Sequence, residues 1–237
     1  MSAAAAARPN ALKVLSGNGP RAAVRELCAQ FEKATGTAVD VAVDVNPEVL
    51  RRAEAGEAFD VAVGNPETIE QLIRSGKVVP GSRADIGRSG LGVAVRSGAA
   101  KPDISTVEAF KRALLAANAI AFPGEGASGR YFVSLLDRMG IAPQMQGKLK
   151  PSPGEDTVEV VARGEADMVV VVATRIVGVP GVDTVGAIPE ALQTKIGFAA
   201  GLSPSSARPE TAKALIKFLT APAAATMLRA KGVEPAR

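Results

Sequence analysis

Histidine and tryptophan are absent from this chain of 237 residues, which has one cysteine and one tyrosine. Without histidine, neither a Ser-His-Asp nor a Cys-His catalytic group can form, and no imidazole can bind a metal ion. The single cysteine, Cys28, excludes an internal disulfide framework and a zinc site made of several cysteines. Its helical spacing with Leu27 and Phe31 predicts a buried thiol. Aromatic residues make up 3% of the chain, so stacking surfaces for sugars or single-stranded nucleic acid are scarce. We expect no metal site.

A large excess of charge of one sign is also missing. The chain has 28 lysines and arginines against 24 aspartates and glutamates, which gives a net charge of +4. The longest basic run is the pair Arg51 and Arg52, and acidic residues alternate with basic ones along the helical stretches. The sequence therefore predicts no nucleic-acid partner, whereas a mild positive excess attracts small anions.

Long hydrophobic runs are missing as well. No segment approaches the roughly 20 apolar residues of a membrane span, and the most apolar run, residues 168–173, is followed by Thr174 and Arg175. The first residues, Met-Ser and five alanines, lack the basic start and strong apolar stretch of an intact signal peptide. We expect that an export signal is not present in this sequence.

Extended and helical segments alternate along the whole chain, which predicts an α/β protein with largely parallel sheets. The segments 90–96 and 195–202 are extended and nearly symmetric about residues 119–188. We interpret them as two crossings between lobes. The expected lobes are residues 10–88 with 201–237, and residues 89–200.

Turns of one kind follow three successive strands in the first lobe, at residues 16–20 (SGNGP), Asn46-Pro47 and Asn65-Pro66. Asn is a strong N-cap and Pro suits the first helical position, so each predicts a strand-to-helix turn. In an open parallel sheet such helix N-termini meet at the carboxyl ends of the strands, where they favour an anion. Residues 124–129 (GEGASG) offer a matching turn in the second lobe. Good capping alone is the alternative interpretation.

Two other functions have weaker signals. Gly17 and Gly19 with Ala22 fit the loose dinucleotide pattern, with Asp44 near the end of the next strand, but Pro20 suits such a loop poorly. Neither glycine loop is followed by Lys-Ser/Thr, so a Walker A loop is absent. We expect no cofactor. For general acid–base chemistry the best-placed residues are Glu125 and Lys195, for which a solvated surface role is the alternative.

Several phrases of the sequence together carry a resemblance to a known family. They are residues 16–19 (SGNG), 31–36 (FEKATG), 56–63 (GEAFDVAV), 105–111 (STVEAFK), 126–129 (GASG), 164–167 (GEAD) and 212–222 (AKALIKFLTAP). The chain resembles the periplasmic molybdate-binding-protein-like solute receptors of ABC transporters. The resemblance implies a two-lobed type II binding-protein fold with two crossing strands, an anion held in the cleft, an ABC permease as partner, a periplasmic location and a monomer.

The ligand-binding residues expected on this basis lie in the turns of both lobes. Ser16 matches the first-lobe serine of the family, but Asn46 and Val172 stand where further hydroxyl donors are expected. Arginines beside the loops favour a di- or tricarboxylate instead. Similar proteins include bacterial aconitate isomerases, so an isomerase of an unsaturated tricarboxylate is the alternative function, with Glu125 and Lys195 as its proton-transfer candidates. The expected binding residues are Ser16, Asn18, Gly19, Arg21, Asn46, Asn65, Ser128, Gly129, Arg130, Thr174 and Arg175.

Overall fold

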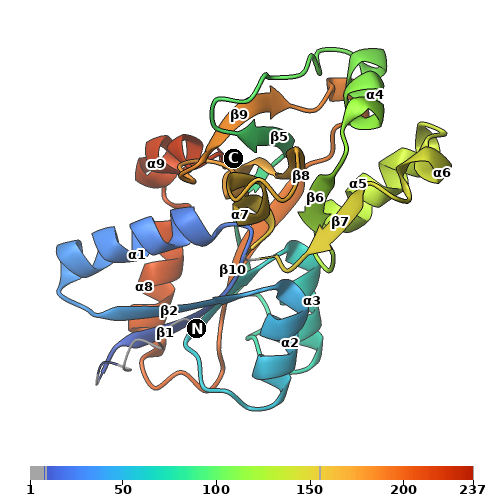
Figure 1. Ribbon diagram of the computed structural model, residues 1–237. Helices are drawn as coiled ribbons and strands as arrows, with labels where there is room; N and C mark the ends of the chain where they lie inside the picture. The colour runs from blue at the N-terminus through green and yellow to red at the C-terminus, as the bar shows by residue number, and fades with distance from the viewer. Residues whose placement is uncertain (1–7, 9, 155, 237) are drawn as a thin grey trace. The chain divides into compact units, whose positions relative to one another are not determined.

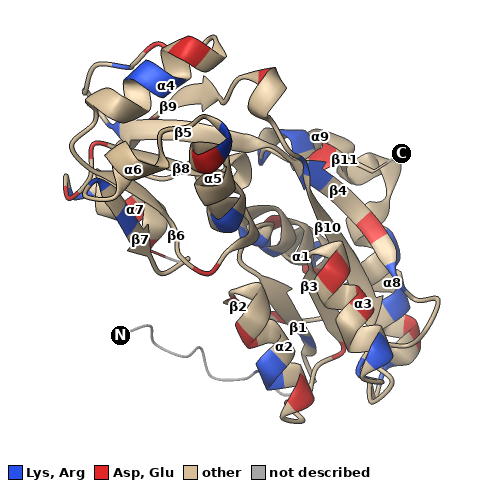
Figure 2. Ribbon diagram, turned by 90° about the vertical axis from the view of Figure 1, so that its right-hand side faces the viewer, with Lys and Arg blue, Asp and Glu red and all other residues tan. Residues whose placement is uncertain are grey.

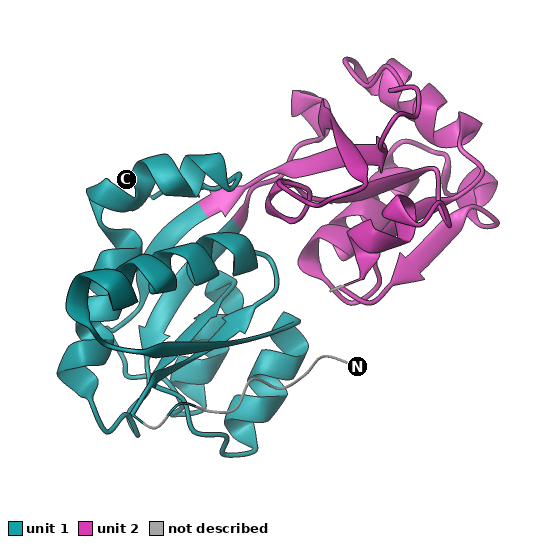
Figure 3. Ribbon diagram, turned by 60° about the vertical axis from the view of Figure 1, so that its left-hand side comes forward, with its two compact units in different colours: residues 1–87, 197–237 teal, residues 88–196 magenta. Residues whose placement is uncertain are grey.

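The protein was analysed as a computed structural model, which describes residues 8 and 10–236 except residue 155. The chain forms two compact units (Figure 3). One unit contains the chain up to Gly87 and from Gly197 onward, and the other is Arg88–Ile196. Residues 197–200 thus belong to the first unit, whereas the sequence analysis places them in the second. The reason is that strand β10 (Ile196–Leu202) pairs with β3 (Val61–Gly64) in the first unit.

The first unit is built on a six-stranded mixed sheet. Strand β1 (Leu12–Gly17) lies parallel to β2 (Val39–Asp44) and β3, while β10 runs antiparallel to β3. Because the three parallel strands end at the same edge, the turns that follow them lie close together. The full strand order is β11 (Glu234–Pro235), β4 (Ala84–Ser89), β10, β3, β1 and β2.

Helices cover both faces of this sheet (Figure 1). One apolar cluster joins Leu15 and Ala62 of the strands to Val49 and Ile69, and these two residues lie on α2 (Asn46–Glu54) and α3 (Pro66–Arg74). On the other face, α1 (Arg21–Thr35) packs against α8 (Pro209–Thr220). There the rings of Phe31 and Phe218 meet edge to face at 5.6 Å between centroids, a geometry that stabilises beyond area burial alone. The last helix is α9 (Ala225–Ala230).

The second unit has a five-stranded mixed sheet. Parallel pairs join β6 (Ile120–Pro123) to β7 (Leu149–Ser152) and β8 (Met168–Val172), while β5 (Leu91–Arg96) is antiparallel to β8 and β9 (Val182–Ala187). Phe110 and Phe132 are fully buried against one face of this sheet. They come from α4 (Val107–Ala116) and α5 (Ala127–Arg138). The shorter helices are α6 (Ala142–Met145) and α7 (Thr157–Ala162).

The predicted α/β class is confirmed, with mixed rather than largely parallel sheets. The segment 90–96 is not a crossing, because β5 lies entirely in the second sheet. The chain passes between the units at residues 87–88 and again at 196–197. Strand β4 is absent from the sequence prediction, since ADIGRS has no alternation of apolar and polar residues. Among the helices of the described residues, none combines the length and the apolar character that crossing a bilayer requires.

Candidate functional site

The first-unit edge, defined here as the carboxyl ends of β1, β2 and β3 with the turns after them, brings six of the predicted binding residues together. Ser16 is aligned with Val43 of β2 and Val63 of β3, and its side chain is fully buried. Its hydroxyl donates to the carbonyl oxygen of Gly17 at 3.0 Å. A hydroxyl can rotate, so Ser16 can also donate to a bound anion. The six residues are Ser16, Asn18, Gly19, Arg21, Asn46 and Asn65.

Two glycines allow the chain to pack closely at this edge. A Cβ atom at Gly17 would lie 2.5 Å from Oδ1 of Asn46, and one at Gly19 would lie 2.8 Å from Cε1 of Phe198. The ring of Phe198 is buried and cannot move aside without opening the core. Glycine at both positions therefore keeps the backbone of this turn close to the sheet.

The helix starts at this edge differ from the sequence prediction. Asn46 is the first residue of α2 and not its N-cap, which is Val45. Asn65 is the N-cap of α3 but makes no side-chain capping bond. Instead, Oδ1 of Asn46 accepts a hydrogen bond from the backbone N–H of Asn65 at 3.4 Å. The asparagines therefore connect two neighbouring turns and do not cap their own helices.

The N-terminus of α1 favours negative charge more than the other two helix starts do. It has no side-chain cap and no acidic residue in its first turn, whereas α2 and α3 carry Glu48 and Glu67 there. The N–H groups of a first helical turn and the helix dipole together attract an anion to such an end. Arg21 lies in this first turn, with Nη1 3.4 Å from Oδ1 of Asn18. This turn combines backbone donors, an amide and a guanidinium.

Asp44, the candidate ribose-binding acid of the nucleotide alternative, is engaged within its own loop. Its Oδ1 accepts from the N–H of Val45 at 2.9 Å, and its Oδ2 lies 3.4 Å from Nη1 of Arg52. These contacts hold the carboxylate at the start of α2. They give the nucleotide alternative no support.

The second-unit edge, defined as the carboxyl ends of β6, β7 and β8 with the turns after them, carries the other predicted residues. Helix α5 begins after Gly126 with no side-chain cap and no acid in its first turn. Ser128 is buried there. A Cβ atom at Gly129 would overlap the carbonyl oxygen of Pro123, so only glycine lets α5 approach β6 this closely. Arg130 folds back over the loop, and its Nη1 donates to the carbonyl oxygen of Glu125 at 2.8 Å.

A buried arginine follows β8. Thr174 and Arg175 form a short 3₁₀ turn directly after this strand, and the Arg175 side chain is only 2% exposed. Nη2 of Arg175 lies 3.9 Å from Oε2 of Glu159, in the first turn of α7. A buried guanidinium needs a negative partner. The sequence does not single out Glu159, because the identity of the acid beside Arg175 depends on how α7 packs.

The candidate proton-transfer residues are less enclosed. Both Glu125 and Lys195 are exposed. Glu125 takes part in the loop through its backbone carbonyl, which accepts from Arg130. The structure places Glu125 on the second-unit edge, close to Arg130 and Ser128, and places Lys195 just before β10. No group of three or more acidic or cysteine side chains suited to a metal ion occurs among the residues that the structure describes.

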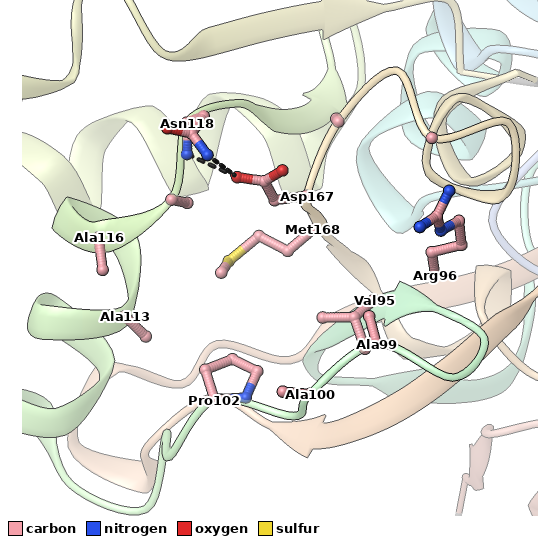
Figure 4. A pocket seen from close by; sticks show the side chains of 13 residues that line it. Val95, Arg96, Ala99, Ala100, Pro102, Ala113, Ala116, Asn118, Asp167 and Met168 are labelled. Atoms are coloured by element: carbon pink, nitrogen blue, oxygen red, sulfur yellow. Dashed lines mark hydrogen bonds between the residues drawn. The ribbon is translucent and has the colours of Figure 1, made fainter.

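A cavity of about 420 Å³ opens at the other end of the second sheet (Figure 4), where β5 ends and β8 begins. Its walls are mainly apolar, with several alanines and Met168. The Asp167 carboxylate in its wall accepts hydrogen bonds from the backbone and side-chain nitrogens of Asn118 at 2.6 and 3.1 Å. This cavity contains none of the predicted binding residues, and the charged side chains in its lining are one carboxylate, Asp167, and one guanidinium, Arg96 (Figure 4).

Charged residues are mixed over the helices of each unit. Figure 2 shows lysines and arginines interspersed with aspartates and glutamates. Many of them form exposed pairs, such as Arg51 with Glu48 and Lys213 with Glu210. Such pairs contribute little to stability. The arginines of the two edges therefore matter for their position and not for a general basic surface.

Comparisons with known proteins agree with this architecture. An aconitate isomerase from Pseudomonas sp. is 35% identical, with the match covering 97% of this chain and 90% of that protein. The periplasmic molybdate-binding protein of Azotobacter vinelandii superposes with a TM-score of 0.81 at 20% identity, over 95% of this chain and all of that one. A sulfate-binding protein of Mycobacterium tuberculosis gives a TM-score of 0.76 at 16% identity, over 96% and 87% of the two chains.

These structures share the fold of two α/β domains, and the resemblance inferred from the sequence is confirmed. The model of the bacterial extracellular solute-binding proteins matches residues 12–234, which is almost the entire chain. The two-lobed type II fold and the family follow together from this match and from the structural neighbours. The chain belongs to the bacterial extracellular solute-binding protein family.

Proposed function

We propose that this protein binds a small carboxylate anion and acts as a solute-binding protein for import. The observation that carries the proposal is the chemistry of the two edges. At each edge a helix begins with no side-chain cap and no acidic residue in its first turn, and an arginine lies in that turn. Each edge also has a buried serine. Backbone N–H groups, hydroxyls and guanidinium groups are the donors that an anion requires.

A carboxylate suits these donors better than a tetrahedral oxyanion does. Arg21, Arg130 and Arg175 stand in or beside the turns, and a planar guanidinium matches a planar carboxylate through two parallel hydrogen bonds. The relative that is 35% identical acts on aconitate, a tricarboxylate. We therefore propose an unsaturated or saturated di- or tricarboxylate as the ligand, with cis- and trans-aconitate as the first compounds to test.

The transport role extends this proposal to a partner and a place. Proteins of this family are extracellular, and one structural neighbour is the substrate-binding domain of a molybdenum ABC transporter. We propose that the protein works as a monomer in the periplasm and delivers its ligand to an ABC permease. Finding an export signal upstream in the native reading frame would support this location. Recovery of the protein in the cytosolic fraction of cells would contradict it.

A second candidate function is isomerisation of aconitate, and the same relative favours it. Moving a double bond along the chain of a tricarboxylate requires removal of a proton from one carbon and its return to another. Glu125 and Lys195 remain the proposed groups for that transfer. Both are exposed in the structure, which favours a solvated surface role over catalysis at these two positions.

A thermal-shift panel tests the binding function. Molybdate, tungstate, sulfate, phosphate, citrate, cis-aconitate and trans-aconitate are each added at increasing concentration. A ligand that binds the folded protein raises the melting temperature according to RT ln(1 + [L]/Kd). We expect a rise with one or more carboxylates and a smaller one with sulfate. No shift with any anion refutes the proposal.

Chromatography of the aconitates then separates the two functions. The protein is incubated with cis-aconitate or with trans-aconitate, and the two isomers are quantified over time. Stabilisation without interconversion supports the receptor. Interconversion supports the isomerase. Incorporation of deuterium from heavy water into recovered aconitate identifies the proton transfer directly.

A further inference from the structure

We propose that Glu159 is an internal competitor for the ligand at Arg175. In the ligand-free protein its carboxylate compensates the buried guanidinium, and a carboxylate of the ligand takes its place on binding. This inference deepens the proposed function and rests on it, because it assigns to Glu159 the control of affinity at the second-unit edge.

Burial makes a negative partner necessary for Arg175. Its side chain is 2% exposed, whereas that of Glu159 is 35% exposed. Removing a guanidinium from water is costly unless a negative charge lies close by. Oε2 of Glu159 is buried, but the side chain as a whole is partly exposed, so its carboxylate can move toward solvent when a ligand takes its place.

The geometry of the pair favours exchange. Nη2 of Arg175 and Oε2 of Glu159 are 3.9 Å apart, which is beyond hydrogen-bond length. A ligand carboxylate that binds a guanidinium through two parallel bonds lies at about 2.7–2.9 Å and interacts more strongly. Glu159 therefore holds Arg175 less tightly than a well-placed ligand can.

The location of the pair connects it to the proposed ligand. Arg175 lies in the turn after β8 and Glu159 in the first turn of α7, which follows β7. Strands β7 and β8 both lie parallel to β6, so both turns belong to the edge that also carries Ser128 and Arg130. The negative charge of Glu159 discriminates between ligands by their charge, because only a ligand that brings an anionic group to Arg175 can replace it.

The test measures affinity for trans-aconitate, with cis-aconitate and citrate as further probes, by isothermal titration. Glu159→Gln removes the competing charge at nearly constant volume. We expect it to bind about fivefold or more tightly than the wild type. Glu210→Gln is the matched control. Its side chain is 83% exposed and pairs with Lys213. Glu210 lies in the first turn of α8, the helix that follows β10. Strand β10 ends beside the start of β3, so Glu210 lies at the end of the sheet opposite the first-unit edge. We expect its affinity to change less than twofold.

A second pair of variants separates competition from general repulsion of an anion. In an Arg175→Met background the Glu159 carboxylate no longer faces the Arg175 guanidinium. Adding Glu159→Gln to that background should then leave the affinity unchanged. An equal gain in both backgrounds means that Glu159 repels the ligand at a distance, which overturns the proposal.

Folding of Glu159→Gln is followed by its melting temperature. The ligand-free variant should melt at a lower temperature than the wild type, because Arg175 loses a negative partner, and trans-aconitate should stabilise it by a larger increment. Unchanged or weaker binding by Glu159→Gln, with a wild type that binds, refutes only this inference. Absence of binding by wild type and variant to all three compounds refutes a tricarboxylate as the ligand of the proposed function.

Discussion

Replacing Arg130 by alanine is expected to weaken carboxylate binding about tenfold. Arg130 folds back over the start of α5, where Nη1 donates to the carbonyl oxygen of Glu125 at 2.8 Å. This bond uses one of the five N–H donors of the guanidinium. A hydrogen bond to a charged group contributes about 1.5–3 kcal/mol, which corresponds to roughly ten- to hundredfold in affinity. Because Arg130 is exposed, solvent screening places the expected loss at the lower end.

Isothermal titration with trans-aconitate provides the measurement. Arg112→Ala is the control, since Arg112 is also exposed and lies on α4, outside the turns. Arg130→Lys keeps the charge without the planar fork and should lose an intermediate amount. The melting temperature of Arg130→Ala should not fall, because a cation in a first helical turn opposes the helix dipole. Wild-type affinity in Arg130→Ala refutes the carboxylate contact. The second-unit edge would then depend on Ser128, Arg175 and backbone donors.

Three further predictions concern stability and reactivity. In urea unfolding, Gly129→Ala should destabilise the fold by about 1–3 kcal/mol, because the added Cβ would overlap the Pro123 carbonyl oxygen. Gly147→Ala is the control. Open space surrounds the atom added there, so its free energy of unfolding should change by less than about 0.5 kcal/mol. Burial raises the pKa of the Cys28 thiol from 9.0 to about 12. Because the thiol ionises at a lower pH in the unfolded chain, the free energy of unfolding should fall as the pH rises from about 9 to 12. Rapid thiol labelling of the folded protein at about pH 8 would contradict this burial. Thr106→Ala should cost about 1 kcal/mol in the same unfolding assay, since the Thr106 side chain caps α4, and an unchanged midpoint would show that the cap contributes nothing.

The sequence predicts the features that depend on local pattern. Helical spacing places Cys28 on the buried face of α1, where the structure has it. The strand-to-helix turns after β1, β2 and β3 occur at the predicted positions, because Gly, Asn and Pro act on the backbone within a few residues. Parallel strands end at the same edge of a sheet, so the turns that follow them lie close together. The structure brings the predicted residues of each unit to such an edge.

Features that depend on tertiary packing could not be predicted in this way. The Asn46 side chain reaches the N–H of Asn65 instead of capping its own helix, since the preference for either contact depends on the neighbouring turn. Glu159 meets Arg175 only because α7 packs beside β8. An arginine three residues after the apolar run 168–172 indicates that an acid must lie near it, but the sequence does not say which one.

The most direct test of anion binding at these edges is a crystal structure of the protein with the best ligand of the thermal-shift panel. The expected result is a ligand carboxylate within hydrogen-bond distance of the residues of one of these edges: Ser16, Asn18 and the first N–H groups of α1, or Ser128, Arg130 and Arg175. A ligand bound only elsewhere, such as in the cavity beside Asp167, would contradict the proposed site.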